Sequence, residues 1–152
     1  MTGPRIATGV CVTVALILMS IAPAAAQSRQ SCTIMINEDG RLAANADNTS
    51  LSSRNQGGRS AEVTVSATNS RYSVYLDKPF GFALAPPGGN DDVRFRVSYS
   101  GRGRAEFSRK PARIPTRIRR GDTRLTINMT ADRLSGSFPG GNYRTGVTVR
   151  CE

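Results

Sequence analysis

The stretch that decides the fold is Val93-Arg94-Phe95-Arg96-Val97-Ser98-Tyr99, in which apolar and polar side chains alternate without a break. In an extended chain successive side chains point to opposite faces, so the apolar side chains at positions 93, 95, 97 and 99 share one face. The arginines and the serine between them share the other face. This alternation is typical of a β-strand with one side in a core and the other in water, and it predicts a strand over residues 93–99.

The same alternation recurs along most of the chain, and no helical period appears after the N-terminal segment. Strands are predicted at residues 31–37, 61–68, 72–76, 105–107, 124–130 and 143–151, with a brief extended segment at residues 80–84. The glycines around Arg102 are expected to form the hairpin turn that joins the strand at 93–99 to the one at 105–107. About seven to eight short strands separated by turns predict an all-β fold, an antiparallel immunoglobulin-like β-sandwich, with a β-barrel as the alternative.

The N-terminal segment has the three parts of a secretory signal peptide. Arg5 lies near the start, an apolar run covers residues 10–21, and Ala24-Ala25-Ala26 supplies the small residues that a signal peptidase reads. A membrane-spanning helix would need about 20 apolar residues, whereas this run is shorter and is followed by a proline. We therefore expect residues 1–26 to be a cleaved signal peptide, residues 27–152 to form a single domain, and no transmembrane segment to remain.

Removal of that signal peptide would leave two of the three cysteines, Cys32 and Cys151, at opposite ends of the domain. An even number of cysteines in an exported protein favours a disulfide, and two unpaired buried thiols are the alternative. Both residues also fall on the apolar face of a predicted strand. We expect a disulfide that joins the first strand to the last.

The composition argues against catalysis, because the sequence contains no histidine. Without histidine the chain has no Ser-His or Cys-His pair and no histidine ligand for zinc. Asp91 and Asp92 adjoin each other near glycines, but no further acidic residues recur at a spacing suited to calcium, so a hairpin entry is the favoured interpretation. We expect no enzymatic activity, no cofactor and no metal site.

Positive charge is the strongest remaining signal, with a formal net charge of +10 and a concentration of basic residues between positions 102 and 124. These candidate anion-binding residues are Arg102, Arg104, Arg109, Lys110, Arg113, Arg117, Arg119, Arg120 and Arg124. Arginine suits phosphate and carboxylate groups, such as those of lipopolysaccharide, acidic polysaccharide or anionic lipid. Nucleic acid is not an expected partner, because Phe107 is the only aromatic residue in the segment. The favoured interpretation is a solvated outer face that adsorbs weakly and salt-sensitively to anionic surfaces.

Two segments carry a resemblance to a known group of proteins. They are Ser31-Cys32-Thr33-Ile34-Met35-Ile36 near the start of the domain and Gly140-Gly141-Asn142-Tyr143-Arg144-Thr145-Gly146-Val147-Thr148-Val149-Arg150-Cys151-Glu152 at its end. This pattern resembles the bacterial fimbrial-subunit type of secreted sandwich, including the pilin and spore-coat-U-like families. The resemblance implies handling by a periplasmic chaperone and an outer-membrane usher. It also implies a sandwich that lacks one strand and is completed by the N-terminal extension of a neighbouring subunit.

The expected N-terminal extension departs from that pattern. After signal removal only residues 27–31 would precede Cys32, and five extended residues span about 17 Å at most, with little apolar content. We therefore expect a terminal or accessory subunit, or a self-sufficient sandwich that is a folded monomer.

Our leading functional prediction is a non-catalytic structural or surface-assembly protein, fimbrial-subunit-like, in the periplasm or at the cell surface, with other envelope or fimbrial proteins as partners. The alternative is a soluble binding module for anionic envelope components, which would act through its arginine-rich face.

Overall fold

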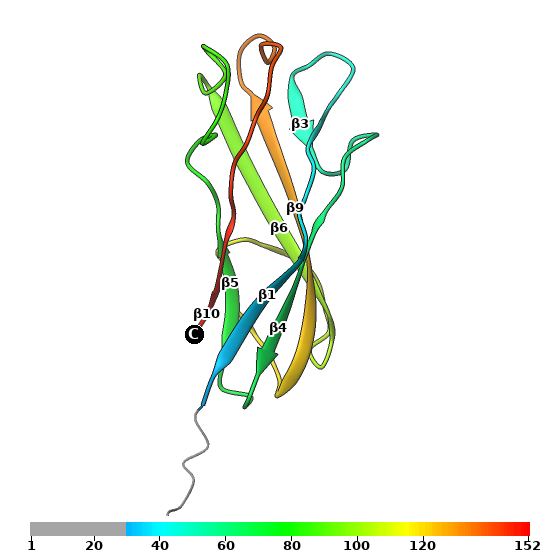
Figure 1. Cartoon of the computed structure of the whole chain (residues 1–152), viewed down its shortest axis with the longest axis vertical. Helices are drawn as coiled ribbons and strands as arrows, with labels where there is room; N and C mark the ends of the chain where they lie inside the picture. Colours follow the sequence, from blue (N-terminus) through cyan, green and yellow to red (C-terminus); the bar gives the residue numbers. More distant parts are fainter. Residues whose placement is uncertain (1–29) are drawn as a thin grey trace, which may run out of the picture.

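The computed structural model describes residues 30–152, which contain strands and turns but no helix (Figure 1). The predicted signal peptide lies outside the described residues. Antiparallel strands form two sheets that pack face to face in a sandwich-like arrangement, and this confirms the predicted fold class at that level.

The larger sheet has seven strands arranged around one long central strand, β9. One edge of β9 pairs with β6 along its length, and the other edge pairs first with β4 and then with β3. The strands of this sheet are β1 (Cys32–Glu38), β2 (Ala43–Ala44), β3 (Ser50–Ser52), β4 (Ala61–Ala67), β6 (Val93–Gly103), β7 (Phe107–Pro111) and β9 (Gly121–Arg133).

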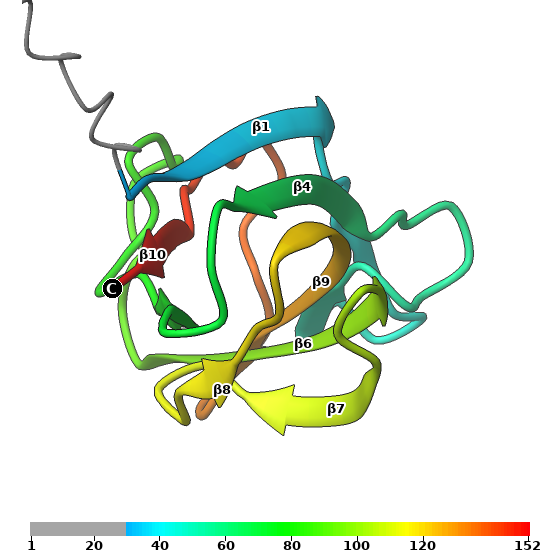
Figure 2. The ribbon, with the colours of Figure 1, turned by 90° about the horizontal axis from the view of Figure 1, so that it is seen from below.

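The smaller sheet has three strands in the order β10 (Thr148–Cys151), β5 (Ser73–Asp77) and β8 (Thr116–Arg117). Seen along the long axis, the two sheets surround a common core, with β10 next to β1 and β8 next to β7 (Figure 2). Ala112 joins the two sheets on the β7 side. Its N–H donates to the carbonyl oxygen of Val97 on β6, and its own carbonyl oxygen accepts from the N–H of Leu76 on β5.

The alternating pattern correctly predicts which side chains point inward. Phe95, Val97 and Tyr99 on β6 are buried, whereas Arg94 and Arg96 between them are exposed. The same alternation places the apolar positions of β4 and β9 in the core, and on β9 the polar Thr123 is buried with them. Burial of apolar surface therefore fixes the register of these strands, because a slip by one residue would turn every apolar side chain to water.

Three details of the predicted elements are wrong. The turn was expected around Arg102, but β6 continues to Gly103 because it keeps pairing with β9 up to Thr123. Residues 80–84 form bends with a single isolated bridge at Leu84. The last strand begins only at Thr148. In the predicted part before it, Arg144 forms one isolated bridge, with Leu84.

The core has two parts along the long axis of the sandwich, called lower and upper in the orientation of Figure 1. The lower part contains Tyr99, whose hydroxyl lies 2.8 Å from the carbonyl oxygen of Val74, 2.6 Å from that of Ile114 and 2.9 Å from Oγ1 of Thr116. These contacts join β6 to the smaller sheet. The upper part is an aromatic cluster, in which edge-to-face contacts connect Phe82, Phe95, Phe138 and Tyr143.

The predicted disulfide between Cys32 and Cys151 is present, with the two Cα atoms 6.3 Å apart. It joins β1, at the edge of the larger sheet, to β10, at the edge of the smaller sheet. Such bonds form in oxidising compartments, so the bridge is consistent with an exported protein.

Candidate functional site

Strand β1 has a neighbour on only one side within residues 30–152. It pairs with β4, so that Ile34 lies opposite Val65 and Ile36 lies opposite Val63. Among the described strands, the other edge of β1 faces β10 without a strand pairing, and β10 in turn pairs only with β5. Two strand edges with unpaired backbone groups therefore border the same side of the sandwich.

The inward-facing side chains of β1 are not covered. Val65 is 0 % exposed and Val63 is 4 % exposed, but their cross-strand partners Ile34 and Ile36 are 38 % and 70 % exposed. Since the pleat turns all four side chains to the same face, the difference reflects what lies above them. Strand β10 of the smaller sheet lies beside β1 at the disulfide end, but the segment that precedes β10 diverges from β1 and leaves Ile34 and Ile36 without a covering layer (Figure 1).

A groove opens between β1 and the segment that leads into β10. It has a volume of about 1210 Å³ and reaches from the edge of the sandwich to side chains of both core regions. Apolar side chains that line it include Ile34, Ile36, Val63, Ile127, Val147 and Val149. In Figure 1, β1 and the C-terminal segment lie close together at their lower ends and diverge above.

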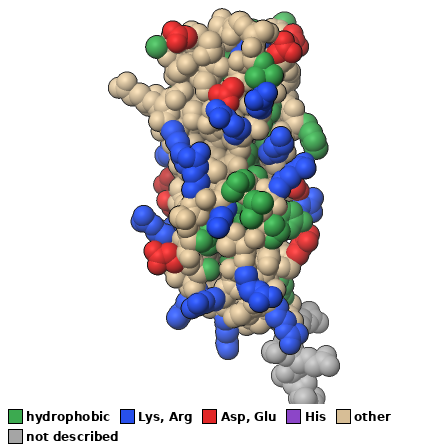
Figure 3. Space-filling view, turned by 180° about the vertical axis from the view of Figure 1, so that it is seen from behind, with side chains coloured by type: hydrophobic (Ala, Val, Ile, Leu, Met, Phe, Trp, Pro, Cys, Tyr) green, Lys and Arg blue, Asp and Glu red, His purple; other side chains and the backbone are tan. Residues whose placement is uncertain are grey.

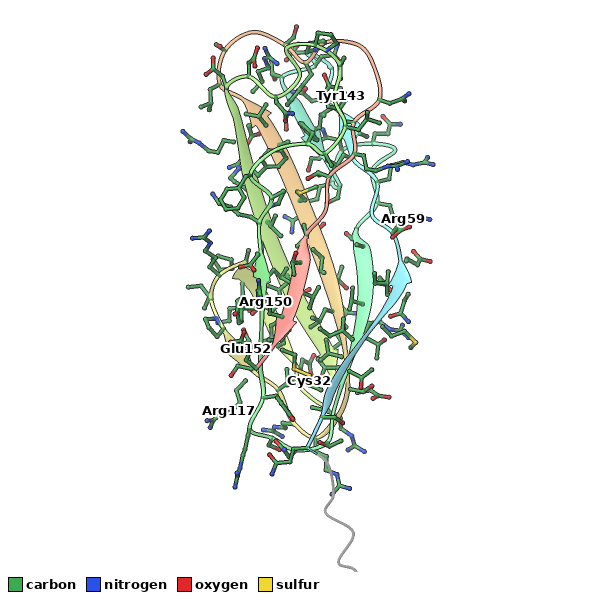
Figure 4. The ribbon with its side chains drawn as sticks, turned by 60° about the vertical axis from the view of Figure 1, so that its left-hand side comes forward. Cys32, Arg59, Arg117, Tyr143, Arg150 and Glu152 are labelled. Carbon is green, nitrogen blue, oxygen red and sulfur yellow. A yellow bond between two sulfur atoms is a disulfide. The ribbon has the colours of Figure 1, made fainter. Side chains whose placement is uncertain are left out.

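The two ends of the groove are closed by different means. The disulfide at Cys32 holds its lower end, and Tyr143 from the aromatic cluster lies at its upper end (Figure 4). The Tyr143 hydroxyl donates to the carbonyl oxygen of Pro139 at 2.7 Å, and its ring packs 4.8 Å from that of Phe82. Tyr143 thus has a packing role in this domain.

Polar side chains on the face away from the groove connect β10 to its neighbour β5. Nε of Arg150 lies 2.5 Å from Oδ2 of Asp77, and this hydrogen bond raises the pKa of the guanidinium. The Tyr75 hydroxyl donates to Oε1 of Glu152 at 2.9 Å, which raises the pKa of Tyr75. These groups are exposed, so each contact contributes little to the free energy of unfolding.

The chemistry of the groove suits binding. Its only ion pair within the described residues joins Arg59 Nε to Glu38 Oε2 at 3.8 Å, and both side chains are exposed. Residues 30–152 contain no group of three or more Cys, Asp and Glu side chains that could hold a metal ion. What the groove offers is an apolar wall at alternate positions and two unpaired backbone edges.

The structure distributes the basic residues predicted from positions 102 to 124 over several elements. Arg102 on β6 lies directly opposite Arg124 on β9, and Arg117 lies on β8 in the other sheet. Arg104 follows β6, Arg119 and Arg120 follow β8, and Arg109 and Lys110 belong to β7. Lysine and arginine side chains are scattered over the face seen in Figure 3.

Arg109 and Arg113 of that set line a shared concavity, together with Arg54, Lys78 and Arg96. No sequence pattern pointed to this grouping, because its members come from separate segments. The exposure of Ile36 was also not predicted, since alternation reports the direction of a side chain and not what lies above it.

The described part of the chain has no helix that is long and apolar enough to cross a membrane. No protein-family model, curated protein or solved structure matches this sequence. The fold and the site themselves define the class of the protein. It is an antiparallel sandwich-like domain whose terminal strands are joined by a disulfide and which is open along an apolar groove.

Proposed function

We propose that this protein is a non-catalytic, strand-accepting subunit of an exported surface assembly, similar in mechanism to fimbrial subunits. The observation that carries the proposal is Ile36, which lies on the core-facing side of β1 and is nevertheless 70 % exposed at the mouth of an apolar groove. Folded domains seldom leave such a row of apolar side chains beside unpaired strand edges unless a partner covers it.

The ligand that fits this groove is an extended polypeptide segment. Its backbone would pair with the free edge of β1 or β10, and its side chains at alternate positions would enter the groove. Fully burying an isoleucine side chain contributes about 1.5–3 kcal/mol relative to leaving it exposed. Covering Ile34 and Ile36 together with Val147 and Val149 therefore offsets much of the cost of ordering the segment.

The composition of the chain favours a donor segment from a different protein. Residues 27–31, which would remain ahead of Cys32 after signal cleavage, are Gln-Ser-Arg-Gln-Ser and contain no apolar side chain. A second copy could not fill an apolar groove with this sequence. This supports an accessory or terminal position in an assembly, where the subunit accepts a strand and passes none on.

The disulfide and the predicted signal peptide support an exported location for the protein. A structural bridge between Cys32 and Cys151 is typical of proteins that fold outside the cytosol. We place the protein in the periplasm or at the cell surface, with envelope or fimbrial proteins as its partners.

The proposal is tested with a synthetic peptide of about ten residues in which valine and threonine alternate. Binding to the folded state should raise the melting temperature of the purified mature protein as the peptide concentration increases. A peptide of the same composition with valines and threonines in adjacent pairs is the control, because it cannot present one apolar face in an extended conformation.

Two neighbouring residues of β1 provide matched variants. Ile36 points toward the groove, and Met35, which is 58 % exposed, points to the opposite face. Ile36→Lys should abolish the peptide-induced rise in melting temperature, and Met35→Lys should retain it. If both peptides act equally, or if neither acts on the unmodified protein, the strand-accepting function is wrong.

A further inference from the structure

A second concavity, of about 670 Å³, lies against β6, β7 and β9 and shares no lining residue with the apolar groove. We call it the basic pocket because its charged lining residues are Arg54, Lys78, Arg96, Arg109 and Arg113. We propose that the basic pocket binds an anionic saccharide whose sulfate or carboxylate groups pair with these side chains. This inference is independent of the strand-accepting groove.

The fold assembles the basic pocket from distant parts of the chain. Arg96 and Arg109 lie on β6 and β7, whereas Arg54, Lys78 and Arg113 follow β3, β5 and β7. Strand pairing and the Ala112 junction between the sheets bring these segments together. The grouping is therefore a product of tertiary structure and not of a local run of basic residues.

The positive charge of the basic pocket is largely uncompensated. No Asp or Glu is among its described lining residues, and one lining side chain forms a salt bridge, Arg96, whose Nη2 lies 2.6 Å from Oδ2 of Asp132. Arg54, Lys78, Arg109 and Arg113 make no salt bridge within residues 30–152. Like charges that share a concavity repel one another, and they raise the local concentration of anions.

Polar groups between the cations suit the hydroxyl groups of a sugar. Ser98, Asn128 and Thr130 line the basic pocket on the outer face of β6 and β9, where Ser98 lies opposite Asn128. Oδ1 of Asn128 accepts hydrogen bonds from the hydroxyls of Ser53 and Ser60, at 3.1 and 2.8 Å, which leaves the amide N–H groups of Asn128 as donors.

The aromatic content argues against nucleic acid as the ligand. Phe95 is the only aromatic residue that lines the basic pocket, and it is 5 % exposed because its ring belongs to the aromatic cluster. Single-stranded nucleic acids gain much of their affinity from bases stacked on accessible aromatic rings. A saccharide needs no such ring, since guanidinium groups can pair with its oxyanions and neutral polar groups with its hydroxyls.

The test is calorimetric titration of the mature protein at about 0.15 M salt, where diffuse attraction is screened beyond about 8 Å. The probes are a heparin-derived tetrasaccharide, which carries both sulfates and carboxylates, and a tetragalacturonate, which carries carboxylates alone. A thymidine hexanucleotide serves as the nucleic-acid comparison. Saturable binding of one saccharide per protein is expected for at least one of the two. Binding of the heparin fragment alone would show that sulfates are needed, and binding of tetragalacturonate would show that carboxylates suffice.

Two triple variants with the same change of net charge separate a site from diffuse attraction. Arg54→Gln, Lys78→Gln and Arg113→Gln together alter the basic pocket. Arg117→Gln, Arg119→Gln and Arg120→Gln together alter exposed cations elsewhere. The pocket variant should weaken saccharide binding by about tenfold or more, since each charge-assisted hydrogen bond contributes at least that much. The control variant should change it by less than about twofold.

All six substituted side chains are exposed, so both variants should keep the melting temperature of the unmodified protein. Amide chemical shifts of the unmodified protein offer a second readout, and the saccharide should perturb Ser98, Asn128 and Thr130 first. Equal losses in the two variants, absence of saturable binding by either saccharide, or tighter binding of the hexanucleotide would overturn the proposal.

Discussion

Ile36 and Val63 lie opposite each other across β1 and β4 and on the same face of the sheet, yet Ile36 is 70 % exposed and Val63 is 4 % exposed. The smaller sheet ends at β10, which lies beside β1 at the disulfide end, so Ile34 and Ile36 farther along β1 face the groove instead of a second layer. Position in the pleat alone does not bury a residue.

Because of this difference in exposure, we expect truncation to alanine to lower the free energy of unfolding much more at Val63 than at Ile36. Val63→Ala should lower the free energy of unfolding by about 1–3 kcal/mol, because it removes buried methyl groups and leaves a cavity. Ile36→Ala should change it by no more than about 0.5 kcal/mol, as at an exposed site. Urea denaturation of the purified variants measures both values. A cost at Ile36 as large as that at Val63 would mean that β1 is covered in solution.

The disulfide should be a major contributor to stability, because it links residues 119 positions apart. Replacing Cys32 and Cys151 together by serine should lower the free energy of unfolding by about 2–5 kcal/mol. Thiol titration of the denatured, unreduced mature protein should find no free thiol. Two free thiols, or a double variant as stable as the parent, would contradict this role.

Tyr99→Phe should destabilise the domain by about 1–3 kcal/mol, because the hydroxyl that contacts Val74, Ile114 and Thr116 is lost inside the core. Tyr75→Phe is the matched control, since its hydroxyl contacts Glu152 at the surface, and it should cost less than about 0.5 kcal/mol. Denaturant midpoints distinguish the two. Equal effects would mean that the Tyr99 contacts add nothing beyond those of a surface hydroxyl.

Burial also raises the pKa of Tyr99 above 10.0, against a smaller opposing effect of the Thr116 hydrogen bond. Above pH 10 the unfolded chain releases this proton before the folded protein does, so the free energy of unfolding falls as pH rises from there. Below the unfolded pKa the contribution is fully present. Midpoints measured at about pH 9 and 11 should differ less in Tyr99→Phe than in the unmodified protein. An unchanged difference would show that Tyr99 does not dominate the alkaline loss.

Signal cleavage is predicted to follow Ala26, so N-terminal sequencing of exported protein should begin at Gln27. A purified protein that retained Met1 would contradict both the predicted compartment and the reasoning that left an even number of cysteines.

Much of the fold could be predicted from the sequence because the strands β4, β6 and β9 each have one face in the core and one face toward solvent, and this gives an alternating pattern. On β6, the alternation of Val97 with Arg96 and Ser98 identifies both the strand and its inner face. The short strands β2, β3 and β8 have two or three residues each, too few for any period to appear. The sequence predicts the β6–β7 turn too early because glycines are typical of turns, whereas Gly103, which has a positive φ of 115°, still pairs with β9.

The sites could be predicted less well, because both depend on tertiary arrangement. The apolar positions of β1 predict an inward face, but the extent of the opposite sheet decides whether Ile36 is covered. The basic pocket likewise draws Arg54, Lys78 and Arg96 from outside the segment where basic residues are concentrated in sequence. The cysteines were the exception, since their number and their positions at the two ends of the domain sufficed to predict the pairing.

The most direct test of the strand-accepting groove is residue-resolved hydrogen exchange of the β1 amides, measured with and without the alternating valine and threonine peptide. In an antiparallel edge strand every second amide points away from its single neighbour. Alternate amides between Thr33 and Glu38 should therefore exchange rapidly in the protein alone and become protected when the peptide is added. Protection of all β1 amides in the free protein, or exchange rates that the peptide leaves unchanged, would contradict a groove that accepts a strand.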